Sequence, residues 1–364
     1  MILHRYFARR FLFAFAGVFA IFSVMTGFLD LIDQLRRFGG SGASFDAILG
    51  LSLLNLPGAV YKILPLIMIL ATIAMFLSLA RSSEMVVTRA AGRSALRALT
   101  APIGVTLVLG TLAVAVMNPI VAATSRQYDL RAGRLSGHDN VLSISRDGLW
   151  LRQGGAAGQT VIRATGANLD GTRLSGVTFF GFGPDGAPRE RVEAKTAVLR
   201  DGGWTLSDAK VWDLSAGGNP EAGALTSPSY RIASTLTPDQ IRDSFGAPSS
   251  ISIWDLPNFI AQLRGAGFSV TRHEVWLQSE LTLPTFLIAM VLIGAGFTMR
   301  HQRGGNTGVM VLAAILLGFG LYFIRNFAQA LGENGQLPVL LAAWAPPLAA
   351  IGLSLGLILH LEDG

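Results

Sequence analysis

Six long runs of apolar residues divide the chain, and each is long enough to cross a lipid bilayer as a helix. A helix needs about 17 to 25 predominantly apolar residues to span the hydrocarbon core. The runs cover residues 11–29, 63–80, 98–117, 281–299, 308–324 and 337–359. This pattern predicts a polytopic α-helical membrane protein with three transmembrane helices near the start of the chain and three at its end.

Between the third and fourth runs, apolar residues alternate with polar ones instead of clustering. Segments such as VLSISRDGLWLRQ and AVLRDGGWTLSDAKVWDL show this alternation, and Asp-Gly and Gly-Gly pairs separate them. Alternation with such turn signals is typical of half-buried β-strands. We therefore predict an inserted all-β domain, an antiparallel sandwich or jelly roll, over residues 120–272 between helical segments 1–119 and 273–364. Near its end, IWDLPNFIAQLRGAG has helical spacing and a glycine stop, which predicts a short helix.

Composition supports the membrane assignment. The 364 residues are 51% hydrophobic and only 14% charged, and the mean hydropathy is +0.49. The net charge of +6 does not indicate nucleic-acid binding, because the charges are dispersed around apolar runs and no zinc-finger or RNP pattern accompanies them. The absence of cysteine excludes disulfides and thiolate metal ligands within this chain. The first apolar run lacks a small-x-small cleavage site, so we interpret it as a membrane helix rather than a signal peptide.

The basic residues of the short loops predict the orientation. Three loops carry them: His4, Arg5, Arg9 and Arg10; then Arg81, Arg89, Arg93 and Arg97; then Arg300, His301 and Arg303. Six spans place these loops on one side, which the positive-inside rule makes cytoplasmic. Both termini are then cytoplasmic, and the β-domain lies in the opposite compartment.

No catalytic constellation accompanies the membrane helices. The five histidines are isolated from one another along the sequence, and HExxH, GxSxG and GxxxxGK[ST] patterns are all absent. We expect no metal, no cofactor and no catalytic residue in this chain. If ATP drives a transport function, another chain must hydrolyse it.

The segment 81–97 interrupts the apolar runs with one acid among several arginines. Residues 82–94, SSEMVVTRAAGRS, predict a short amphipathic helix with Ser82 or Ser83 as its N-cap. One interpretation is a basic loop without a partner. The other is a coupling helix that docks on a nucleotide-binding subunit, where Glu84 forms a charge-assisted pair with a partner arginine. The candidate coupling residues are Arg81, Glu84, Met85, Val86, Arg89, Ala90 and Gly92.

Three stretches resemble the lipopolysaccharide export permeases of the LptF/LptG family, and the LptG branch in particular. They are DQLRR at 33–37, SSEMVVTRAAGRS at 82–94 and LTPDQIRDSFGAPSSISIWDLPNFIAQLRGAG at 236–267. The resemblance covers essentially the whole chain. It implies a subunit of the inner membrane in a Gram-negative envelope. This subunit would pair with an LptF-like permease and with a dimeric LptB-like ABC ATPase. The ATPase would bind ATP and Mg. Together they would extract lipopolysaccharide from the inner membrane.

The resemblance also assigns roles to particular parts of the chain. Residues 82–94 become the coupling helix, and Glu84 matches the glutamate understood to contact an arginine of the ATPase. The β-domain becomes a periplasmic jelly roll that passes lipid to similar folds, in a single-span LptC-like protein and an LptA-like bridge.

A second set of charges lies at the outer end of the first apolar run, in FLDLIDQLRRFGG. Arg36 and Arg37 match two family lysines thought to engage lipid phosphates, and arginine binds phosphate bidentately. Interfacial anchoring by basic residues at a helix end is the simpler alternative. Asp33 lies beside them, and Asp30 departs from the family, which often has lysine at its position.

Arg325, near the outer end of the fifth predicted span, is the other charge near the membrane interior. Such charges usually face a partner or a wet cavity, so we hypothesise that Asp30 and Arg325 face the lipid cavity. The alternative is that each side chain extends to the headgroups, and whether the two pair within one chain stays open. Lys62, at the start of the second run, favours an interfacial anchor over a lipid ligand. We expect Glu274 and Glu280 to be solvated or interfacial.

The combined prediction is an LptG-like permease subunit without enzymatic activity. The LptF-like paralogue shares the same plan and is the first alternative. A membrane-anchored periplasmic assembly module is the second, and for it the substitution of Glu84 would be harmless. An intramembrane enzyme lacks a plausible cluster of catalytic groups.

Overall fold

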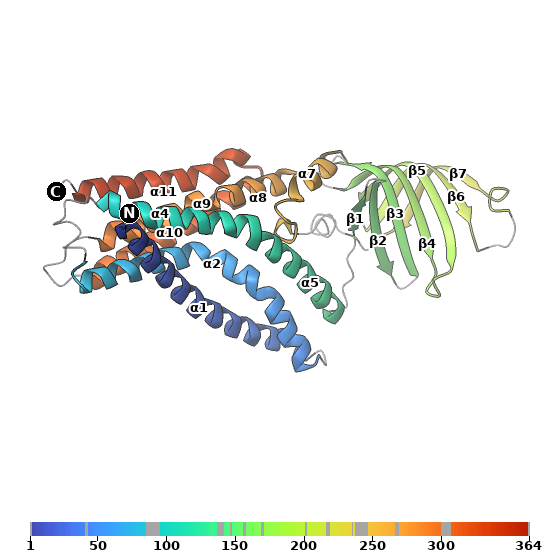
Figure 1. Ribbon diagram of the computed structural model, residues 1–364. Helices are drawn as coiled ribbons and strands as arrows, with labels where there is room; N and C mark the ends of the chain where they lie inside the picture. Colours follow the sequence, from blue (N-terminus) through green and yellow to red (C-terminus); the bar gives the residue numbers. More distant parts are fainter. Residues whose placement is uncertain are drawn as a thin grey trace. The chain divides into compact units, whose positions relative to one another are not determined.

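The computed structural model consists of two compact units (Figure 1). It describes residues 2–40, 43–84, 95–136, 142–145, 148–155, 158–168, 171–200, 202–215, 219–234, 236, 247–265, 269–299 and 307–362. The membrane unit comprises Met1–Ser136, Ser249–Trp254 and Thr271–Gly364, and the β unit comprises Gly137–Pro248 and Asp255–Val270.

The membrane unit contains the predicted six spans. The helices of the first half are α1 (Ile2–Phe38), α2 (Phe45–Arg81), α4 (Ala95–Leu112), the π-helical turn η1 (Ala113–Met117) and α5 (Asn118–Ser136). Those of the second half are α8 (Thr271–Leu281), α9 (Leu283–Thr298), α10 (Thr307–Glu333) and α11 (Val339–Glu362). Among the described residues, five helices are long and apolar enough to cross a membrane, and the pair α8–α9, bent by 49°, is the sixth when its two helices are counted as one span. The predicted three-plus-three helix plan is therefore confirmed.

Several helices extend beyond the apolar runs that predicted them. The side chain of Ser44 caps α2 by accepting from the Ala47 amide, so this helix begins well before residue 63. Lys62 consequently lies inside α2 and not at its start. In the third span, helix continues through α5 to Ser136, so the β unit begins later than residue 120. Alanine, leucine, arginine and glutamine are good helix formers, and they sustain α5 where hydropathy falls.

Helices α2 and α9 form the centre of the membrane unit. Buried aromatic and sulfur-containing side chains join them to α1, and these are Phe7, Phe11, Phe76, Phe286 and Met290. The most apolar window of α2 is 61% buried within the chain, whereas that of α1 is 0% buried and that of α10 is 11% buried. Most of the apolar window of α1 and of α10 is thus not buried by the rest of the chain.

The β unit is one antiparallel sheet whose seven strands follow chain order. The strands are β1 (Leu142–Ser145), β2 (Gly148–Gly155), β3 (Gly158–Ala167), β4 (Arg173–Phe182), β5 (Pro188–Arg200), β6 (Gly203–Asp213) and β7 (Leu225–Ala233). The inserted antiparallel β-domain is confirmed. Its described strands are joined as successive hairpins in a single sheet, instead of forming two sheets. Tight turns with left-handed glycines, such as Gly202 at φ 72°, favour pairing between sequence neighbours.

The sheet is curved (Figure 1), and its inward residues explain how one sheet encloses a core. Inward residues normally recur every second position, but in the middle strands two buried residues lie three apart. These pairs are Leu174 and Val177 in β4, Ala194 and Ala197 in β5, and Leu206 and Ala209 in β6. In β4 and β6, a left-handed residue between the two members of the pair, Gly176 (φ 55°) and Asp208 (φ 54°), keeps both on the inner side.

The predicted short helix is α7 (Leu256–Gly265), and it belongs to the β unit. Its Leu263 is only 1% exposed and packs in the same core as the fully buried Trp204. The amphipathic spacing that predicted the helix therefore also identified the face that covers the sheet.

Candidate functional site

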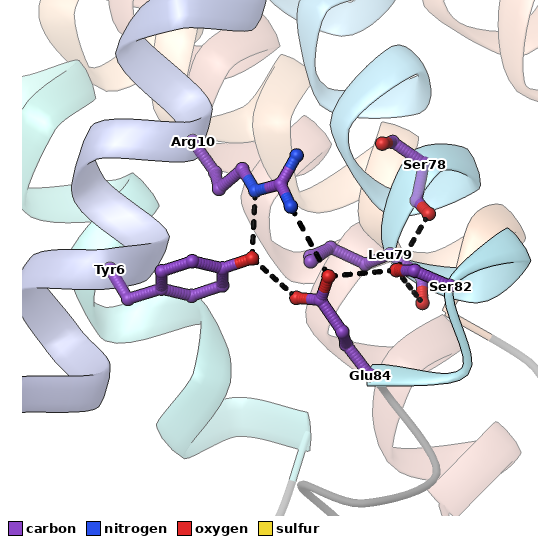
Figure 2. A network of polar contacts seen from close by, with 6 residues as sticks. All are labelled: Tyr6, Arg10, Ser78, Leu79, Ser82 and Glu84. Atoms are coloured by element: carbon purple, nitrogen blue, oxygen red, sulfur yellow. Dashed lines mark hydrogen bonds and ion pairs between the residues drawn. The ribbon is translucent and has the colours of Figure 1, made fainter.

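The carboxylate of Glu84 is held by side chains from α1 and from the turn that follows α2 (Figure 2). Tyr6, on α1, donates its hydroxyl to Glu84 Oε2 at 2.6 Å. Arg10, one turn further along α1, places Nη2 3.2 Å from Glu84 Oε1. The hydroxyl of Ser82 lies 2.9 Å from the same oxygen. We call Tyr6, Arg10, Ser82 and Glu84 the Glu84 cluster.

The local sequence explains why Glu84 points back at α1. Helix α2 ends at Arg81, and just beyond it the Ser82 amide donates to the Ser78 carbonyl and the Ser83 amide to the Ala80 carbonyl. Ser83 then adopts a left-handed conformation with φ 58°, which reverses the chain direction. This turn brings Glu84 beside the first two turns of α1.

The side chains of Tyr6 and Arg10 also contact each other, in addition to their contacts with Glu84. They are four residues apart and so lie on one face of α1. Arg10 Nε donates to the Tyr6 hydroxyl oxygen at 2.8 Å. The Arg10 guanidinium also lies 5.3 Å from the centroid of the Tyr6 ring. The two donors to Glu84 are therefore oriented by contacts within α1.

These contacts stabilise the ionised form of Glu84. The hydrogen bond from Tyr6 is the largest cause that lowers the pKa of the Glu84 carboxyl, and Ser82 and Arg10 act in the same direction against partial burial. The Glu84 side chain is 30% exposed. A negatively charged group is thus held in a defined position where a partner protein can reach it.

The structure places the other predicted coupling residues as follows. Arg81 is exposed on the last turn of α2. Met85, Val86, Arg89, Ala90 and Gly92 lie outside the described residues, as does most of the predicted coupling helix. Tyr6 and Arg10 were not predicted as partners of Glu84. Their spacing on one helix face was visible in the sequence, but only the fold shows that this face meets the end of α2.

The predicted lipid-facing charges lie on different surfaces. Arg36 and Arg37 are exposed in the last turn of α1, where cations favour the helix dipole. Asp33 is exposed nearby. Asp30 is half-buried, and its Oδ1 accepts from Asn55 on α2 at 2.6 Å. The departure from the family's usual lysine is therefore accommodated by a hydrogen bond between α1 and α2.

Arg325 has partners of its own and does not meet Asp30 among the contacts of this chain. Its Nη2 donates to the carbonyl of Ser279 at 3.1 Å, and its guanidinium lies 5.2 Å from the centroid of the Phe286 ring. With Lys62 it lines a cavity of about 270 Å³ that also contains Glu280 and Glu333. The structure thus brings Arg325 and Lys62 to one cavity.

Glu280 is the charged residue that the sequence analysis placed wrongly. It was expected to be solvated or interfacial, but it is only 3% exposed. Tyr61 and Asn118 both donate to its Oε2. Glu280 directly precedes an apolar run, and hydropathy alone does not distinguish a helix end at the surface from one packed among other helices.

Comparison with known proteins agrees with this architecture. Residues 5–360 match the family described as lipopolysaccharide export system permease LptF/LptG. The chain is 25% identical over 350 residues to the lipopolysaccharide export system permease protein LptG of Escherichia coli (strain K12), which covers 92% of both chains. It is 24% identical over 358 residues to LptG of Haemophilus influenzae, which covers 96% of both chains. The chain belongs to the LptF/LptG family of lipopolysaccharide export system permeases and is most similar to LptG.

Proposed function

We propose that this permease subunit acts in an ABC-type transporter as its LptG-like half, with Glu84 as the residue through which a separate ATPase moves the membrane helices. The observation that carries this proposal is the Glu84 cluster, in which an ionised carboxylate beyond the end of α2 is bound to α1. A partner arginine that meets this carboxylate would act on two membrane helices at once. The ATPase, similar to LptB, would bind ATP and Mg, and this chain would carry no cofactor.

The second permease would be LptF-like and would pack on α1 and α10. These two helices support the proposal because their apolar windows are 0% and 11% buried within the chain. Apolar surface of this extent requires lipid or another membrane protein as its neighbour. The cavity between the two permeases would hold lipopolysaccharide, with Arg36 and Arg37 near its phosphates.

The β unit would receive the lipid and pass it toward the outer membrane. In this proposal it lies in the periplasm and both termini lie in the cytoplasm. Among its described strands, β1 and β7 are the edges of the sheet, since the order β1 to β7 does not close on itself. Edge strands pair readily with strands of other chains. An LptC-like protein and an LptA-like bridge would therefore extend the lipid path.

The experiment is purification of the chain from native membranes in mild detergent, as wild type and as Glu84→Ala, with mass spectrometry of the proteins and lipids that co-purify. We expect the wild type to recover an ABC ATPase, a second permease and lipopolysaccharide. Loss of a charge-assisted contact should lower ATPase recovery by about tenfold in Glu84→Ala.

Asp46→Ala is the matched control, because Asp46 is an exposed acid in the first turn of α2, the helix that Glu84 follows. It should leave ATPase recovery unchanged. Equal ATPase recovery from wild type and Glu84→Ala would contradict the role of Glu84. Recovery of the wild-type chain without any ATPase would contradict the ABC transporter assignment itself.

A further inference from the structure

A buried carboxyl group joins three helices of the membrane unit, α8, α2 and α5. Glu280 lies on α8, one residue before the chain bends into α9, and is 3% exposed. The hydroxyl of Tyr61 on α2 donates to Glu280 Oε2, and Nδ2 of Asn118 on α5 donates to the same oxygen at 3.0 Å. A charged group inside a membrane protein is costly unless it is paired, and it is a candidate functional residue.

Arg325, on α10, lies beside this buried carboxyl group. Its Nη2 donates to the carbonyl of Ser279, which is the residue before Glu280, at 3.1 Å. Arg325 and Glu280 line one cavity, and their opposite charges attract each other. We call Tyr61, Asn118, Glu280 and Arg325 the Glu280 cluster.

Asn118 extends this cluster to a segment far away in the sequence. While its Nδ2 donates to Glu280, its Oδ1 accepts from the Ile253 amide at 2.9 Å. Asn118 directly follows the π-helical turn η1, and the carbonyl of Ala115 in that turn accepts from Trp254 Nε1 at 3.0 Å. A π-helical turn displaces carbonyl groups from the regular α-helical pattern and often marks a functional site.

The segment held by these contacts connects two parts of the β unit. Ser249–Trp254 belongs to the membrane unit, whereas the residues up to Pro248 and those from Asp255 to Val270 belong to the β unit. The chain therefore leaves the β unit, binds Asn118 and Ala115, and returns to form α7. We call Ser249–Trp254 the anchored segment.

We propose that the Glu280 cluster couples the position of α10 to that of the anchored segment, with Arg325, Glu280 and Asn118 as positioning residues. A displacement of α10 moves the Arg325 guanidinium relative to Ser279 and Glu280. Asn118 transmits this change to the Ile253 amide, because its side-chain amide binds Glu280 and Ile253 at opposite ends. The membrane helices thereby act on the segment that leads into α7. This role does not depend on Glu84.

Hydrogen–deuterium exchange of the full chain, purified in mild detergent, tests the coupling without ATPase activity or lipid as a readout. Peptides that cover the anchored segment are compared between wild type and Arg325→Gln. Arg325 is not a hydrogen-bond partner of Ile253, so a local effect at Arg325 alone would leave these peptides unchanged. We expect the protected amide to exchange at least about fivefold faster, as for the loss of one net hydrogen bond.

A control variant and a variant that removes the direct contact make the result decisive. Trp344→Phe removes an indole hydrogen bond of 3.0 Å to Gln278 in the same unit and should leave the anchored segment unchanged. Asn118→Leu removes the direct contact and should accelerate exchange in the anchored segment. If Asn118→Leu has this effect and Arg325→Gln does not, the cluster holds the segment without coupling it to α10, and the proposal is overturned.

The double variant Glu280→Gln/Arg325→Gln removes both charges and so avoids an unpaired buried charge that could unfold the protein. We expect it, too, to accelerate exchange in the anchored segment while the rest of the chain keeps its wild-type protection. Wild-type exchange of the anchored segment in this double variant would overturn the proposal. Glu84→Ala should not change the exchange of the anchored segment. The role of Glu84 in binding the ATPase and the role of the Glu280 cluster are therefore tested by separate results.

Discussion

Glu84 shows how neighbouring side chains position a single carboxylate. Its two oxygens have different partners, since Oε2 accepts from Tyr6 and Oε1 lies near Arg10 and Ser82. Because these groups favour the ionised carboxylate, the native pKa of Glu84 lies below its ordinary value. The cluster is therefore fully formed at pH values above the ordinary glutamate pKa. It is lost only as the pH falls through the lower native pKa, because protonation then removes the charge.

Tyr6→Phe tests this arrangement by removing one hydroxyl and keeping the ring. We expect the pKa of Glu84 to rise, because the largest cause of its lowering is gone. Carbodiimides react with protonated carboxyl groups, so the pH at which labelling of Glu84 is half-maximal, measured by peptide mass spectrometry, should move upward. Tyr322→Phe is the control, since the Tyr322 hydroxyl donates to the Lys62 carbonyl at 3.1 Å. A labelling profile that does not move in Tyr6→Phe would show that Tyr6 does not act on Glu84.

Among the elements, the β-sheet depends on a backbone conformation that alternation alone does not provide. Gly176 lies between the inward residues Leu174 and Val177 of β4 and has φ 55°. A Cβ atom at Gly176 would lie 2.3 Å from Oγ1 of Thr165 on the neighbouring strand β3. Two features therefore require glycine at position 176: its left-handed backbone and the close approach of β3.

Gly176→Ala should destabilise the β unit more than Gly186→Ala does. Gly186 also has positive φ, at 78°, but its Cβ would meet nothing within 4 Å. We expect Gly186→Ala to cost about 1 to 2 kcal/mol for the left-handed conformation. Gly176→Ala should cost at least about 2 kcal/mol more, because of the contact with Thr165. Pulse proteolysis in denaturant, followed on fragments of the β unit, measures both values, and equal losses would contradict the steric argument.

For the whole molecule, the number of spans and the place of the β unit in the sequence predict which loops share a compartment. The described residues contain five single-helix spans and the bent pair α8–α9. When this pair is counted as one span the number is even, which predicts that both termini lie on one side and the β unit, inserted after the third span, on the other. The distribution of arginine in the loops predicts which side is cytoplasmic.

Single cysteines test this orientation directly, because the chain contains none of its own. Ser215→Cys lies on the exposed surface of the β unit, and Ser94→Cys lies in the predicted coupling segment. In spheroplasts, a membrane-impermeant maleimide should label Ser215→Cys immediately and Ser94→Cys only after permeabilisation. The reverse labelling pattern would invert the orientation and would make the pairing of Glu84 with a cytoplasmic ATPase impossible.

The sequence by itself determined the class of fold and the candidate coupling residue. Apolar runs of bilayer length identified the six spans, because lipid admits only a continuous apolar surface and a backbone that is hydrogen-bonded internally. Alternation identified the inserted β-domain, and helical spacing identified α7. Glu84 was singled out because it is the one acid in a basic segment, and the quoted motifs indicated the family that the comparisons confirm.

Only the tertiary structure decided which distant residues meet. Glu280 is separated by 162 positions from Asn118, and Tyr6 by 78 from Glu84, and no local pattern records such contacts. The single curved sheet likewise arises from left-handed residues whose effect depends on the neighbouring strands. Hydrophobic periodicity reports which surface of an element is buried. The pairing of polar side chains depends on helix packing, which brings a few specific atoms within hydrogen-bond distance.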